Sequence, residues 1–291
     1  MHGQLKGSLA LLTASILWGF AFAAQEGAMK IIGPFTFVFM RSIITSVFLF
    51  AIHPLFSRQH KPRLKEHLGP GALMGVVLFT AMSLQQYGLV TTTAAKSGFI
   101  TTLYVLMVPL VGLFLGRRPG LFVWIGMALA VAGLYLLCIN DSFTLQGGDV
   151  FSLLCALAFT MHIIVIARLS DGRDAMLLSA IQFGTCALLG LIATLLFEQP
   201  SYSGIASCIV EILYAAICSG AIAYTLQIFG QRYTEPTLAS LLMCLESFFA
   251  AVGGWVVLGE ALSLREIFGC ALMLAASMLA QLKHNSEKEA L

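Results

Sequence analysis

Charged residues are scarce in this chain: Asp, Glu, Lys and Arg together make up 10% of its 291 residues. Soluble domains carry about 25% charged residues. Hydrophobic residues reach 59%, which is more apolar surface than a single globular core of this length can hide. The scarcity of charge therefore excludes an ordinary soluble domain and predicts a protein that crosses the membrane several times.

Several motifs that carry chemistry are also absent. The seven cysteines form no CxxC pair, so we expect small packing residues rather than a disulfide framework or a metal site. No GxxxxGK[ST], HExxH or GxSxG motif occurs, which gives no support for an ATP-driven pump, a zinc protease or a serine hydrolase. A net charge of +2 gives no support for a nucleic-acid partner. We expect no enzymatic activity, no cofactor and no metal.

What is present is a series of apolar segments, each near the 20 residues that a membrane-spanning helix needs. Short stretches rich in Gly, Pro or charge separate them, and the pattern lacks the alternation of a β-barrel. We predict an all-α integral membrane protein with ten transmembrane helices, at 7–25, 34–55, 70–90, 98–116, 120–139, 148–168, 175–197, 208–230, 237–258 and 264–282.

Positive charge predicts the orientation of these helices, because loops on the cytoplasmic side are enriched in Lys and Arg. With the N terminus in the cytoplasm, twelve of the 16 Lys and Arg residues fall on the inside. Three fall outside, Lys30, Lys96 and Arg265, and Arg41 lies within a helix. We therefore expect a cell inner membrane protein with both termini, including the short tail 283–291, in the cytoplasm.

The two halves of the chain resemble each other. "LQQYG" at 84–88 matches "LQIFG" at 226–230, and the same offset of 142 residues pairs Tyr104 with Glu246. An almost constant offset indicates a duplicated unit. Five helices is an odd number, so the second unit enters the membrane from the opposite side. We predict inverted repeats at 7–139 and 148–282, with a solute site between them near the middle of the bilayer.

The segments "LLTASILWGFAF", "FTFVFMRSIITSVFLF", "LYVLMVPLVGLFLGRRP" and "LESFFAAVGGWVVLGEALS" make the chain similar to the drug/metabolite transporter superfamily, in its branch with two EamA domains. The resemblance covers about residues 7 to 282. It implies export of amino acids, other metabolites or toxic compounds. The chain departs from many relatives in having Ser247 where they have proline after "LE".

Glu246 is the first candidate for the solute site. It lies about ten residues into its helix, roughly 15 Å deep at 1.5 Å per residue, where a charge costs at least about 2.5–3.5 kcal/mol. Two interpretations are open: a site for a proton or a solute amine, or an acid that stabilises helix packing.

Arg41 is the second candidate, about seven residues into the helix predicted at 34–55. It suits a solute carboxylate or a gating ion pair with Glu246, or it caps helix carbonyls and extends toward the interface. We favour a structural or gating role, because the resemblance implies an arginine here in many relatives.

Aromatic and amide side chains inside the predicted helices suit a cavity that binds an organic solute. Each one taken alone is better explained by hydrogen bonding between helices, but we expect some of the set to line a cavity. His162 suits a proton relay, although a packing histidine is the better explanation. The further candidates are Trp18, Tyr104, Tyr224, Gln85, Gln182, Gln227 and His162.

These observations predict a secondary transporter, an exporter of small organic metabolites or amino acids that works by alternating access and is driven by protons. Its partners are then a small solute, the lipid bilayer, protons and, through small-residue motifs, a second copy of the chain. The alternative left open is an integral membrane enzyme acting on a lipid-linked substrate, which would need clustered His, Asp or Glu at a membrane face.

Overall fold

A computed structural model describes residues 2–56, 63–91, 94–116, 119–139, 147–253 and 263–289. Most of these residues are helical, and none of them forms a strand. The helices are α1 (His2–Met29), α2 (Pro34–Phe56), α3 (Leu64–Thr91), α4 (Ala94–Thr102), α5 (Tyr104–Phe114), α6 (Leu121–Cys138), α7 (Gly147–Leu169), α8 (Ala175–Phe197), α9 (Tyr202–Ser207), α10 (Ile209–Tyr214), a π-helix η1 (Ala215–Ala223), α11 (Tyr224–Gln231), α12 (Pro236–Met243), α13 (Glu246–Gly253) and α14 (Leu264–Glu289).

Seven helical stretches of the described chain are long and apolar enough to cross a membrane. They are Pro34–Phe56, Leu64–Val90, Ser97–Phe114, Leu121–Cys138, Gly147–Leu169, Ala175–Phe197 and Ile209–Gln231. Pro236–Val252 is a shorter apolar helix. The all-helical membrane class is therefore confirmed, whereas a count of ten stays a prediction, and residues 254–258 of the ninth predicted helix lie outside the described residues.

The surface of the bundle is apolar, as expected of a protein surrounded by lipid. The last turn of α8 exposes Leu195, Leu196 and Phe197, each at 70%. Polar side chains instead turn inward and bond backbone carbonyls of neighbouring helices: Thr45 Oγ1 donates to Ala216 O at 2.7 Å and Ser46 Oγ to Ala180 O at 2.9 Å. Such bonds satisfy polar atoms where lipid cannot.

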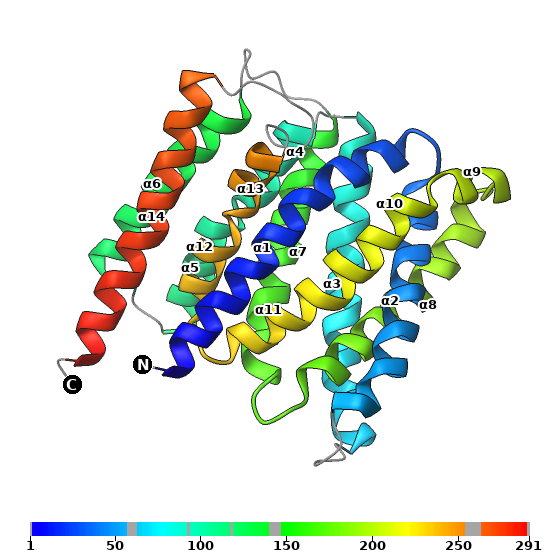
Figure 1. Ribbon diagram of the computed structural model, residues 1–291, viewed down its shortest axis with the longest axis horizontal. Helices are drawn as coiled ribbons and strands as arrows, with labels where there is room; N and C mark the ends of the chain where they lie inside the picture. Colours follow the sequence, from blue (N-terminus) through cyan, green and yellow to red (C-terminus); the bar gives the residue numbers. More distant parts are fainter. Residues whose placement is uncertain are drawn as a thin grey trace.

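Helices that the predicted repeat makes equivalent pack against each other at the two edges of the bundle. At one edge the second helix of each half, α2 and α8, pack together. At the other edge the fifth helices, α6 and α14, do the same. Figure 1 shows that the members of each pair run in opposite directions, and that α1 begins and α14 ends at the same end of the bundle.

Two carboxylates fix helix ends in this arrangement. Glu198, which directly follows α8, accepts hydrogen bonds from the first backbone N–H groups of α2, at Phe35 and Thr36, both at 2.8 Å. Asp174 precedes α8 and accepts from Leu177 N at 2.8 Å. Carboxylates suit helix N-termini because the free N–H groups there carry partial positive charge. The first contact also fixes α2 against the end of α8.

A close glycine crossing sets the distance between α6 and α14. A Cβ atom on Gly133 would lie 2.7 Å from Gly269 O, and one on Gly269 would lie 2.7 Å from Gly133 O. Both contacts are shorter than a real Cβ makes, and the obstructing atoms are backbone. Any side chain here would therefore push the two helices apart.

We predict that Gly133→Ala lowers the free energy of unfolding by about 1–3 kcal/mol, the usual cost of overpacking. Gly69→Ala in α3 is the matched control, because a Cβ there has no neighbour within 4 Å, and it should be neutral or slightly stabilising. Thermal unfolding of both variants in detergent measures the difference. Equal unfolding temperatures would contradict the crossing.

Candidate functional site

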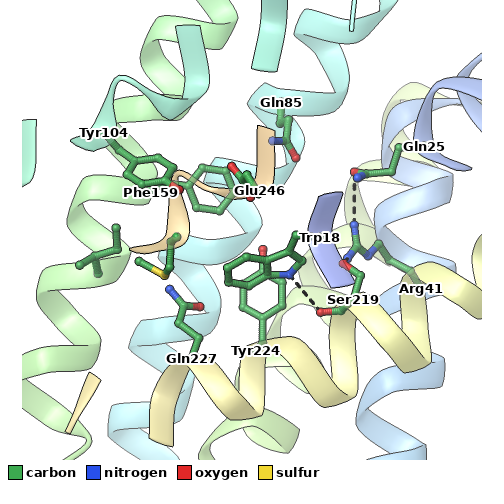
Figure 2. A pocket seen from close by; sticks show the side chains of 12 residues that line it. Trp18, Gln25, Arg41, Gln85, Tyr104, Phe159, Ser219, Tyr224, Gln227 and Glu246 are labelled. Atoms are coloured by element: carbon green, nitrogen blue, oxygen red, sulfur yellow. Dashed lines mark hydrogen bonds between the residues drawn. The ribbon is translucent and has the colours of Figure 1, made fainter. Parts of the chain in front are cut away.

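A cavity lies between the two halves of the chain. The first half contributes side chains from α1, α2, α3 and α5, and the second from α7, η1, α11, α12 and α13. Figure 2 shows these side chains converging from both halves. The lining residues are Trp18, Gln25, Arg41, Gln85, Tyr104, Phe159, Ile163, Ser219, Tyr224, Gln227, Met243 and Glu246.

Seven of the nine residues singled out from the sequence line this one cavity: Trp18, Arg41, Gln85, Tyr104, Tyr224, Gln227 and Glu246. The structure brings them together from six helices and both halves. That they bind a solute stays a prediction.

His162 and Gln182 do not line the cavity. Both are fully buried and bond each other, with His162 Nε2 3.1 Å from Gln182 Oε1. The imidazole also packs edge-on against the ring of Tyr224, with centroids 6.1 Å apart. The pair therefore joins α7 to α8 behind the cavity wall, which fits the packing interpretation of His162 better than a relay.

The sequence analysis missed five lining residues: Gln25, Phe159, Ile163, Ser219 and Met243. Gln25 had a usable signal, because it follows Trp18 by seven residues and two helical turns place both on one face. Ser219 had none, since its position depends on an irregular stretch of backbone.

Glu246 lies where a helix is interrupted. α12 ends at Met243 and α13 begins at Glu246, and in the first half α4 ends at Thr102 and α5 begins at Tyr104. Because Tyr104 and Glu246 correspond at the repeat offset, the two interruptions occupy equivalent places. The Glu246 carboxyl accepts from Thr102 Oγ1 at 3.5 Å and stands beside Tyr104 (Figure 2). Its place in the first turn of α13 also favours a carboxylate.

The π-helix η1 supplies backbone carbonyls to the opposite wall. Trp18 Nε1 donates to Ser219 O at 3.2 Å, and Arg41 Nη2 donates to Ala215 O at 3.2 Å. A π-helix leaves its carbonyls less regularly paired than an α-helix, and such segments are often found at functional sites. Here the irregular backbone anchors an aromatic and a cationic side chain of the first half.

Aromatic rings form most of the apolar wall. The Trp18 ring meets the Tyr224 ring edge-on, with centroids 4.9 Å apart. Tyr104 and Phe159 form a second edge-on pair at 6.4 Å. Rings fixed in this way give a rigid apolar surface for an organic solute.

Arg41 and Glu246 share the cavity but do not bond each other. Within the described residues, no salt bridge joins them. The gating ion pair considered from the sequence is therefore not formed in this conformation.

Known proteins share both the sequence pattern and the fold. A sequence profile of the EamA-like transporter family matches residues 5–139 and again 146–281. The chain belongs to the EamA-like transporter family. This confirms the resemblance drawn from the segments in the first, second, fourth and ninth predicted helices.

Relatives of known sequence match nearly the whole chain. An uncharacterized transporter of Archaeoglobus fulgidus is 28% identical over 96% of this chain and 87% of its own length. A chloroplastic WAT1-related protein of Arabidopsis thaliana is 24% identical over 95% of this chain and 70% of its own length. A solved structure with 20% identity superposes with a TM-score of 0.78, covering 95% of this chain and 96% of that one, which shows the shared fold.

Two buried glutamines distinguish the cavity wall, which contains Gln227, from the packing behind it, which contains Gln182. Gln182 holds His162, whereas Gln227 makes no hydrogen bond in the described chain and its Oε1 atom is buried without a partner. Gln182→Ala should lower the free energy of unfolding by about 1 kcal/mol, because it leaves His162 unpaired.

Gln227→Ala removes a side chain of the same size but no hydrogen bond, so its unfolding temperature should stay within about 1 °C of the wild type. Thermal unfolding of the two variants is the measurement. A larger loss for Gln227→Ala than for Gln182→Ala would contradict this assignment.

Proposed function

We propose that this EamA protein is a secondary transporter that exports small organic metabolites or amino acids by alternating access, driven by protons. The observation that carries the proposal is the cavity between the halves, which holds a carboxyl and a guanidinium deep in an apolar bundle. Ionisable residues at such depth usually mark a solute or ion pathway.

The proposed architecture is ten transmembrane helices in two inverted five-helix repeats, at 7–139 and 148–282. The two segments matched by the EamA profile and the antiparallel pairs α2–α8 and α6–α14 support it. In such a design the halves rock against each other around a central site.

We place the chain in the cell inner membrane with both termini in the cytoplasm, as the distribution of Lys and Arg predicts. Dimerisation stays a prediction.

We propose Glu246 as the group that couples transport to protons. Glu246 is 8% exposed, and in the described chain its carboxyl has the side chains of Thr102 and Tyr104 as hydrogen-bond partners. A carboxyl with few fixed partners can bind a proton in one conformation and release it in another. Relatives named as transporters favour this carrier over the membrane enzyme considered from the sequence.

Glu246→Gln should abolish proton-driven export, because the amide keeps the shape of the acid but cannot exchange a proton. Export is measured in proteoliposomes with and without a pH gradient. Glu66→Gln is the matched control, since Glu66 is an exposed acid at the start of α3, and it should transport like the wild type. Gradient-driven export by Glu246→Gln at the wild-type rate would refute the coupling role.

A further inference from the structure

Arg41 is a buried cation without a counter-ion in the described part of the chain. The residue is 2% exposed. Its Nη1 donates to Gln25 Oε1 at 3.5 Å, and its Nη2 to Ser219 Oγ at 2.9 Å and Ala215 O at 3.2 Å. All three acceptors are neutral. An isolated charge in an apolar medium costs several kcal/mol unless a partner of opposite sign compensates it.

The guanidinium also has hydrogen-bonding capacity to spare. It carries five N–H groups, and its two Nη atoms make three hydrogen bonds to the protein. The group also lies 5.8 Å from the centre of the Phe37 ring. Its Nε atom is shielded from solvent and has no partner. A buried polar atom of this kind is rare in folded proteins and calls for an unseen partner. A carboxylate fits, because its two oxygens match the planar fork of an arginine.

Glu246 does not supply that carboxylate. No salt bridge joins it to Arg41 in the described residues. Figure 2 shows the two side chains apart.

Gln25 is one of the three residues that hold the guanidinium. Its Oε1 atom accepts from Arg41 Nη1 on α2 and also from Gln86 Nε2 on α3, at 2.6 Å. Its own amide donates to Ala21 O at 3.3 Å. An amide that bonds groups on α1, α2 and α3 has little freedom, so Gln25 keeps Arg41 at the cavity wall. Gln25 is neutral, and a glutamate at the same position would have almost the same shape.

We propose that the transported solute carries a carboxylate and that Arg41 binds it, with Gln25 acting as the positioning residue. The apolar part of the solute then packs on Trp18 and Tyr224. This assignment rests on the proposed transport function and adds the chemical class of the solute.

Three probes of nearly equal size and different charge test the assignment: 3-phenylpropionate, 3-phenylpropionamide and 3-phenylpropylamine. Calorimetry with the purified full-length protein measures their affinities. The acid should bind at least tenfold more tightly than the amide, because charge-assisted hydrogen bonds to arginine are worth more than neutral ones. The absence of such a preference, whether the amine binds best or no probe binds, overturns the proposal.

Gln25→Glu is the decisive variant, since it keeps Arg41 and the size of its neighbour but places a carboxylate beside the guanidinium. Affinity for 3-phenylpropionate should fall at least tenfold, and affinity for the amide should not change. Wild-type affinity of the variant for the acid overturns the proposal.

Arg41→Lys provides a second comparison that keeps the positive charge. This variant should still prefer the acid over the amide, with weaker binding of the acid than in the wild type. Loss of all discrimination between acid and amide would overturn the role of charge.

The two proposals fail in different ways. If proteoliposomes move the amine or the amide but not the acid, the carboxylate assignment falls and the transport function stands. If no solute moves in response to any gradient, the transport function itself falls.

Discussion

Lipid offers no hydrogen bonds, and this constraint decides where the polar groups within the membrane lie. Backbone at membrane depth must be helical unless it is enclosed by protein or lines a cavity. A charged side chain within the membrane is likewise tolerated only where it faces the bundle interior or a cavity. Five features of the protein satisfy this condition, because they meet at one cavity: Arg41, Glu246, the interruptions before Tyr104 and Glu246, and the π-helix. The helices away from the cavity, such as α6 and α14, are regular.

The irregular elements are also what gives the cavity its chemistry. The interruption between α12 and α13 places Glu246 in a first turn, and the π-helix presents carbonyls to Trp18 and Arg41. A continuous α-helix at either place would bond its own carbonyls and point its side chains elsewhere. The positive and negative groups stay apart in this conformation, so each keeps the capacity to bind something other than the protein.

The sequence predicted the class and family of this protein well, because both depend on composition and on long segments. It also singled out Arg41 and Glu246, which the structure places in one cavity wall, since a charge within an apolar segment has few other places to go. Their roles stay predictions. It failed where local backbone geometry matters: Ser219 reaches the wall through a π-helix that no residue pattern announced. Gln182 and His162 stood among the site candidates, although packing was the better explanation for the histidine, because polarity alone does not distinguish a cavity wall from the packing behind it.

A single cysteine at Ser219, in a background without the seven native cysteines, tests the central claim most directly. Membrane-impermeant thiol reagents are applied to sealed vesicles of either orientation, and labelling of the cysteine is measured from each side. Two halves that rock around the cavity predict labelling from both sides, with each side favoured under different gradients. Labelling from one side only, under every condition, would contradict a carrier and leave only a one-sided pocket.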